Sequence, residues 1–124
     1  MTEILYKKES YEIIGKCMEV YNTLGGGFLE VVYKDALEIE FQLAEIPYER
    51  EKEYEINYKG NILQRKFVAD FVVMGKIILE VKAAREIHDE NISQSINYLA
   101  VSKNRLALCV NFGKRGLDYK RVLL

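Results

Sequence analysis

The chain has 124 residues, of which 49% are hydrophobic and 30% charged, and its net charge at pH 7 is −1. This size is typical of one domain, expected to span residues 1–124 with a core from about residue 10 to 123, and the composition excludes a disordered chain and a globally basic nucleic-acid binder. Because no apolar run reaches the roughly 18 residues of a membrane-spanning helix and the charged N-terminus has no signal-peptide segment, we expect a cytoplasmic protein that stays out of the membrane.

Two helices are predicted in the first third of the chain. Apolar residues recur at helical spacing over residues 10–24, and the glycines at 25–27 end this pattern because glycine suits a left-handed C-cap. A second helix is predicted from about residue 28 to residue 44, because Pro47 disfavours helical geometry just before it. The first helix is therefore expected to be amphipathic, and one face of the second helix is expected to pack on the sheet.

The rest of the chain is predicted to contain mainly strands. Residues 54–58 alternate polar and apolar side chains before a turn at 59–61, and further strands are predicted at 63–74, 77–84, 106–110 and, at an edge, 119–123. Helical spacing returns at residues 89–102. This order predicts an α/β domain with a mixed sheet, whose first strands are antiparallel and whose helical crossover makes strands 77–84 and 106–110 parallel neighbours.

Three charged residues stand in strands that are otherwise apolar. Asp70 lies in the stretch FVADFVV, and Glu80 and Lys82 lie in IILEVKAA. Charged side chains are seldom buried unless they are paired or bound to something. Alternate residues of a strand share a face, so Glu80 and Lys82 lie together, and Asp70 lies opposite Glu80 only if residues 74–76 form a three-residue turn.

Two carboxylates and a lysine at this spacing form a recognisable chemical unit. Mg²⁺ prefers carboxylate oxygens and keeps several waters, so Asp70 and Glu80 can hold such an ion, while Lys82 can orient an attacking water or neutralise developing negative charge. The alternative is a structural ion-pair network in which Asp70 is the buried partner of Lys82. The spacing alone fits both interpretations.

Four motifs in this order resemble those of a known superfamily. Asp70 followed by Glu80-Val81-Lys82 resembles the D…(D/E)xK signature of the PD-(D/E)XK nuclease superfamily, with Ala69 where the name of the superfamily has proline. Residues 27–33, GFLEVVY, match the G-x-x-E-x-x-Y motif of the small GxxExxY proteins. Residues 94–98, QSINY, resemble the Q-x-x-x-Y box of RecB-like nucleases, and residues 111–113, NFG, are also similar to the family.

The resemblance implies a fold and a metal site. The fold is α/β with a restriction-endonuclease-like core, a mixed sheet flanked by helices in the order ααβββαβ(β). The resemblance implies that Asp70, Glu80 and the Val81 carbonyl bind Mg²⁺ or Mn²⁺, and that Lys82 positions the attacking water. Glu30 resembles the acidic residue of the first core helix, which joins the metal site directly or through water, and we expect its side chain to point inward.

Residues for substrate binding are predicted around this site. The resemblance implies that Gln94 and Tyr98 line the site and touch substrate, whereas a helix side chain that bonds a neighbouring segment is the structural alternative. Lys66 and Arg85 flank the site and are expected to approach a phosphate backbone. His88 is expected to be a cap or surface residue. A local basic face also stays open at residues 113–124, which hold four basic side chains and one acid.

These residues imply a metal-dependent nuclease that acts on DNA or RNA. A homodimer would offer two such sites to a duplex. The alternative is a catalytically inactive module that keeps the fold and binds nucleic acid or a protein partner, which the near-neutral charge favours.

Overall fold

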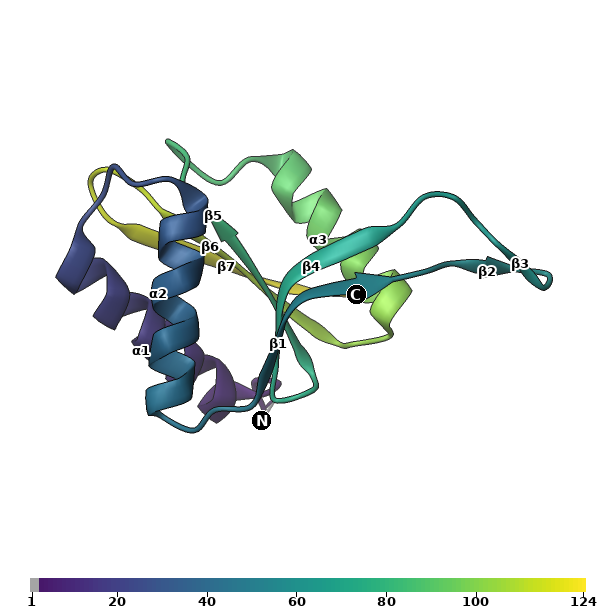
Figure 1. Cartoon of the computed structure of the whole chain (residues 1–124), viewed down its shortest axis with the longest axis horizontal. Coiled ribbons are helices and arrows are strands. Elements are labelled where there is room, and N and C mark those ends of the chain that lie inside the picture. The colour runs from purple at the N-terminus through teal and green to yellow at the C-terminus, as the bar shows by residue number, and fades with distance from the viewer. Residues whose placement is uncertain (1–2) are drawn as a thin grey trace.

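The computed structural model describes residues 3–124, so the first two residues of the predicted domain lie outside it (Figure 1). The helices and strands, in chain order, are α1 (Lys7–Leu24), α2 (Glu30–Leu43), β1 (Tyr48–Tyr54), β2 (Asn57–Tyr58), β3 (Asn61–Ile62), β4 (Phe67–Val73), β5 (Ile77–Lys82), α3 (Asp89–Ser102), β6 (Leu106–Phe112) and β7 (Leu117–Leu123). None of the helices in this part of the chain is both long and apolar enough to span a bilayer.

Five strands form one mixed sheet in the order β1-β4-β5-β6-β7. Strands β5 and β6 are parallel, as the sequence predicts, and the other neighbours are antiparallel. Helices α1 and α2 pack on one face of the sheet and α3 packs on the other (Figure 1). The run at 77–82 is almost wholly buried because helices cover both of its faces, which explains why it lacks polar alternation.

The first strand differs from the prediction. It spans residues 48–54 and not 54–58, and the predicted strand at 63–74 begins only at Phe67. The sequence YEREKEY contains no aliphatic residue. Every second residue is nevertheless half-buried, because tyrosine rings and the long stems of charged side chains can pack against the protein. The predicted turn at residues 59–61 instead joins the short strands β2 and β3, which form the tip of an arm that projects from the sheet (Figure 1).

Strands β1 and β4 change faces halfway along their length. Phe71 packs in the core under α1 and α2, whereas Ala69, two residues earlier, packs in the core under α3. The β1–β4 ladder passes from the Arg50–Phe71 pair to the Lys52–Ala69 pair, with Glu51 in a left-handed conformation (φ 54°) between them. A positive φ is rare for a residue other than glycine, and Glu51 lies opposite Asp70.

The glycine run packs tightly against the loop after β6. A Cβ atom on Gly26 would lie 2.6 Å from the carbonyl oxygen of Gly113, closer than real contacts allow. We therefore expect Gly26→Ala to lower the free energy of unfolding by about 1–3 kcal/mol in urea denaturation. The matched control is Gly15→Ala in α1, where a Cβ meets nothing within 4 Å and the helix gains about 0.8–1 kcal/mol. Equal stability changes for both variants would contradict the close packing.

Candidate active site

The sheet opens into a fork between β4 and β5, and this fork holds the predicted carboxylates. The two strands pair at Val73–Ile77, Val72–Ile78 and Phe71–Leu79, so residues 74–76 form the three-residue turn that the cluster requires. The next residues along the two strands are Asp70 and Glu80. Their side chains therefore meet at the point where backbone pairing stops.

The two carboxylates replace the missing ladder bonds. The Val81 N–H donates to Asp70 Oδ2 at 2.8 Å, and the Asp70 N–H faces Glu80 Oε1 at 3.4 Å. Glu80 is only 3% exposed. Burial and the neighbouring Asp70 carboxylate raise the pKa of Glu80 to about 9, although Lys82 opposes this rise. Glu80 therefore holds a proton at neutral pH when no metal is bound.

Lys34 and Glu51 complete the cluster, and sequence reasoning missed both. Lys34 Nζ lies 2.9 Å from Asp70 Oδ1 and also pairs with the Glu51 carboxylate, with the Lys34 side chain only 12% exposed. Burial lowers the pKa of Lys34, but hydrogen bonds to Glu51 and Asp70 outweigh burial and raise it. The structural alternative expected Lys82 as the partner of Asp70; the described ion pair is with Lys34.

Lys82 and Gln94 lie together beside the carboxylates. Lys82 Nζ is 3.5 Å from Gln94 Oε1, and Gln94 is exposed on α3. Tyr98, one turn further along α3, is buried, and its hydroxyl donates to the Val68 carbonyl at 2.9 Å. Burial, with the Glu80 charge, raises the pKa of Tyr98 to about 12. Gln94 thus reaches the cluster, whereas Tyr98 anchors α3 to β4.

The prediction that Glu30 points inward is wrong. Glu30 is exposed at the start of α2, because the buried stripe of this helix begins one turn later, at Tyr33, and continues through Leu37 and Phe41. Glu30 lines a shallow cavity of about 450 Å³ whose wall also includes Lys34. Glu30 therefore borders the site but lies outside the carboxylate pair.

The other predicted residues lie further out. Lys66 lies before β4 on the projecting arm and pairs with Glu53 at 2.9 Å. Arg85 is exposed and lines a large cavity beyond β5. His88 is the N-cap residue of α3, which confirms its predicted capping position.

The site suits a divalent ion that binds to two carboxylates and takes its remaining ligands from water and substrate. Within residues 3–124, no three Asp, Glu, His or Cys side chains form a cage for a metal. Asp70 and Glu80 supply two crowded carboxylates, and burial together with the Asp70 charge raises the pKa of Glu80. Mg²⁺ is typically held by one or two carboxylates, with waters and substrate phosphate oxygens completing its shell. The donor set therefore fits such an ion.

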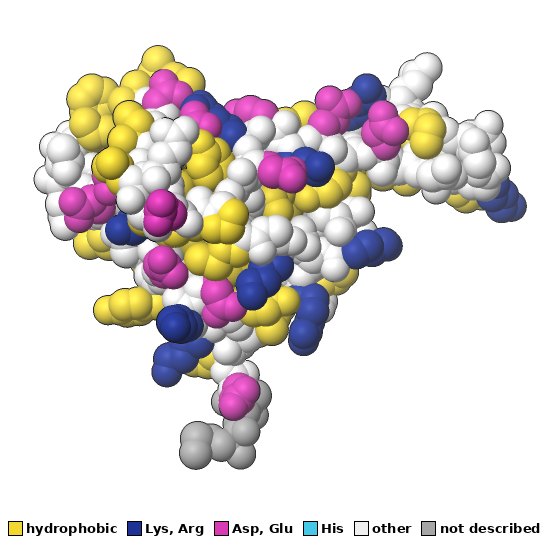
Figure 2. Space-filling model, turned by 60° about the horizontal axis from the view of Figure 1, so that its bottom comes forward, with side chains coloured by type: hydrophobic (Ala, Val, Ile, Leu, Met, Phe, Trp, Pro, Cys, Tyr) yellow, Lys and Arg dark blue, Asp and Glu magenta, His cyan; other side chains and the backbone are white. Residues whose placement is uncertain are grey.

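One face of the molecule is of mixed charge. Figure 2 shows acidic and basic side chains interspersed over one face, with no broad basic area. This agrees with the net charge of −1. Recognition of nucleic acid would therefore depend on particular basic side chains near the site and not on the overall field of the molecule.

Comparisons with known proteins agree with the fold. A family model described as the PD-(D/E)XK nuclease superfamily matches residues 7–122. The crystal structure of SSO0001 superposes with a TM-score of 0.60 and 22% sequence identity, over 95% of this chain and 59% of that chain, a likeness that shows the fold alone. No curated protein matches. The mixed sheet flanked by helices is the restriction-endonuclease-like fold that the sequence predicts.

Proposed function

Because the chain belongs to the PD-(D/E)XK nuclease superfamily, we propose that it is a metal-dependent nuclease that hydrolyses phosphodiester bonds in DNA or RNA. The observation that carries this proposal is the meeting of Asp70 and Glu80 at the strand fork, with Lys82 following on the same strand. Nucleases of this superfamily generally use divalent metals. We further propose membership of its GxxExxY group, with the RecB-like Q-x-x-x-Y box, on the motifs at 27–33 and 94–98.

The geometry of the fork supports a choice of metal-binding residues. Asp70, Glu80 and the Val81 carbonyl would hold Mg²⁺ or Mn²⁺, and Glu30, which is exposed, would contribute through water. The bound ion supplies Lewis-acid activation of the phosphate and of a water. Glu80 must release its proton when the ion binds, because a ligating carboxylate is ionised.

The remaining residues position the reactants. The Lys82 ammonium lies beside the carboxylates and would orient the attacking water, and the Gln94 amide oxygen holds this ammonium in place. Tyr98 acts as a positioning residue, since its hydroxyl ties α3 to the Val68 carbonyl, two residues before Asp70. Arg85 would contact the phosphate backbone at the site, and Lys66 would do so from the arm.

A second candidate function is a nuclease-fold module that binds nucleic acid or a protein partner without cleaving it. One observation favours it: Lys34 already neutralises Asp70, the residue that a metal would need.

For both candidate functions we propose a single domain over residues 1–124 that is located in the cytoplasm. A homodimer would present two sites to a duplex, and sedimentation velocity would test for it.

Metal-dependent melting and cleavage separate the two candidates. We expect Mn²⁺ and Mg²⁺ at millimolar concentration to raise the melting temperature of the native protein but not that of Glu80→Gln. With metal, the native protein should cleave single-stranded, duplex or branched DNA, or RNA, and Glu80→Gln should not. Binding without cleavage would support the inactive module, and no thermal shift with either metal would refute the metal site.

A further inference from the structure

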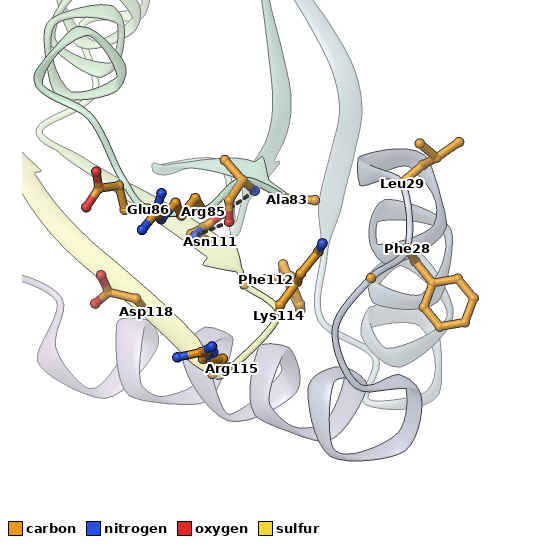
Figure 3. Close-up of a pocket in the computed structure, with 14 residues that line it drawn as sticks. Phe28, Leu29, Ala83, Arg85, Glu86, Asn111, Phe112, Lys114, Arg115 and Asp118 are labelled. Atoms are coloured by element: carbon orange, nitrogen blue, oxygen red, sulfur yellow. Dashed lines mark hydrogen bonds between the residues drawn. The ribbon is translucent and has the colours of Figure 1, made fainter.

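A large cavity lies next to the active site, and the carboxylate cluster does not use it. Its volume is about 840 Å³, and it is walled by three loops, at residues 27–29, 83–86 and 111–118 (Figure 3). The first loop contains the start of the G-x-x-E-x-x-Y motif and the third contains the NFG motif. Two of the four motifs therefore contribute residues to the wall of this cavity.

Hydrogen bonds fix the walls of the cavity in advance. The Asn111 side chain accepts from the Ala84 N–H at 2.8 Å and donates to the Ala84 carbonyl at 3.0 Å (Figure 3). The Tyr33 hydroxyl donates to the Gly25 carbonyl at 2.7 Å and accepts from the Phe28 N–H at 3.2 Å. The asparagine and the tyrosine of the two motifs thus hold the loops in place, so a ligand would meet a preformed site.

Three basic side chains surround the cavity. Arg85, Lys114 and Arg115 come from two different loops (Figure 3), and none of them takes part in an ion pair among residues 3–124. Two acids, Glu86 and Asp118, also line the cavity. Three cations suit phosphate oxygens, while carboxylates can accept hydrogen bonds from the amino groups of a base. This mixture suits a whole nucleotide better than a bare anion.

The cavity borders the region of the active site. Ala83, on its wall, directly follows Lys82 in the chain. The smaller cavity beside Lys34 shares Phe28, Leu29 and Ala83 with the large one. A ligand in the large cavity would therefore lie near the proposed cleavage position.

We propose that this cavity binds one unpaired nucleotide next to the scissile phosphate, and that Arg85, Lys114 and Arg115 bind its phosphate. The inference rests on the proposed function for the position of the scissile phosphate. A concave site of this volume takes a ligand of nucleotide size, whereas a base held in a duplex cannot enter it. The substrate class is therefore a single strand, or a strand end or flap, in preference to a continuous duplex.

Binding can be measured without cleavage, by fluorescence anisotropy of a labelled single-stranded oligonucleotide in EDTA. We expect the native protein to bind this oligonucleotide more tightly than the blunt duplex of the same sequence. The double variant Lys114→Gln/Arg115→Gln should weaken single-strand binding by about tenfold, and the salt dependence of log K should fall by about 0.7 for each phosphate that the variant no longer binds. Arg85→Gln should also weaken single-strand binding.

The matched control is Lys7→Gln/Lys8→Gln, which removes the same charge from exposed residues at the far end of α1, about 27 Å along the helix from the glycine loop. This control should change binding less than twofold. Deoxycytidine monophosphate should displace the oligonucleotide at concentrations where inorganic phosphate does not. Absence of single-strand binding, equal affinity for duplex, equal effects of the two double variants, or equal competition by inorganic phosphate would each overturn the inference.

Failure of the inference differs from failure of the proposed function. A protein that binds the single strand through Lys114 and Arg115 but cleaves nothing with Mn²⁺ would refute the nuclease and keep the cavity as a binding site. A protein that cleaves with Mn²⁺ while Lys114→Gln/Arg115→Gln binds as tightly as the native chain would refute the cavity alone.

Discussion

In metal-free buffer, the free energy of unfolding should fall by roughly 2–3 kcal/mol as the pH rises from 6 to 8. The cause is Glu80, whose pKa of about 9 in the folded protein lies well above the value near 4.5 of an exposed glutamate. Between these two values the folded protein holds a proton that the unfolded chain has released. The stabilisation is thus complete below pH 4.5 and is lost as the pH rises through 9.

Urea denaturation in EDTA at pH 6, 7 and 8 measures this effect. Glu80→Gln keeps the shape of the protonated carboxyl group and cannot ionise, so its stability should vary much less over this range and should exceed that of the native protein at pH 8. Glu12→Gln, an exposed substitution on α1, should keep the native slope. If the native protein and Glu80→Gln showed the same slope, Glu80 would not be the group that titrates.

The same experiment with Mn²⁺ should show a smaller fall in stability. A metal ion competes with the proton for Glu80, and its binding strengthens as the pH rises and the proton leaves. The ion therefore stabilises the folded state most where the metal-free protein is weakest. This coupling links the buried acid to the proposed metal site through a quantity that needs no nucleic acid substrate.

Removing the Lys34 ammonium should tighten Mn²⁺ binding by roughly 10- to 100-fold. Lys34 Nζ lies 2.9 Å from Asp70 Oδ1, so it neutralises the carboxylate that the metal needs and would repel an ion bound there. In Lys34→Met the Asp70 carboxylate has lost this ammonium, and both effects disappear. Isothermal titration calorimetry with Mn²⁺ gives the dissociation constant directly.

Lys34→Met should also lower the stability of the metal-free protein, because Asp70 and Glu51 lose their shared partner. Added Mn²⁺ should restore this stability. Lys52→Met makes the same charge change at a more exposed ion pair with Glu49, and should leave the dissociation constant within about threefold of the native value. Equal affinities in Lys34→Met and the native protein would show that the ammonium does not compete with the ion.

The meeting of Asp70 and Glu80 could be predicted on the condition of a three-residue turn, because it depends on local rules. Strand alternation places Glu80 and Lys82 on one face, and a three-residue turn places Asp70 opposite Glu80. Both follow from spacing along consecutive strands. The parallel pairing of β5 with β6 could likewise be predicted from the intervening helix.

Lys34 and Glu51 could not be found in this way. They reach Asp70 from α2 and β1, and only tertiary packing determines which helical residue lies over which strand. Lys34 nevertheless carries a signal, since it lies one turn after Glu30 on the same side of the helix. The error at Glu30 has the same origin: helical spacing predicts a common face but not where along the helix burial begins.

The change of face at Glu51 and Asp70 also bears on how the two carboxylates are held. The core under α1 and α2 contains Phe71 and Val73 of β4, whereas the core under α3 contains Ala69 and Val72. Asp70 thus lies where the side chains of β4 pass from one core to the other, and packing on both faces of the sheet fixes its position. We therefore expect a substitution in either core, far from any charged residue, to alter the separation of Asp70 and Glu80.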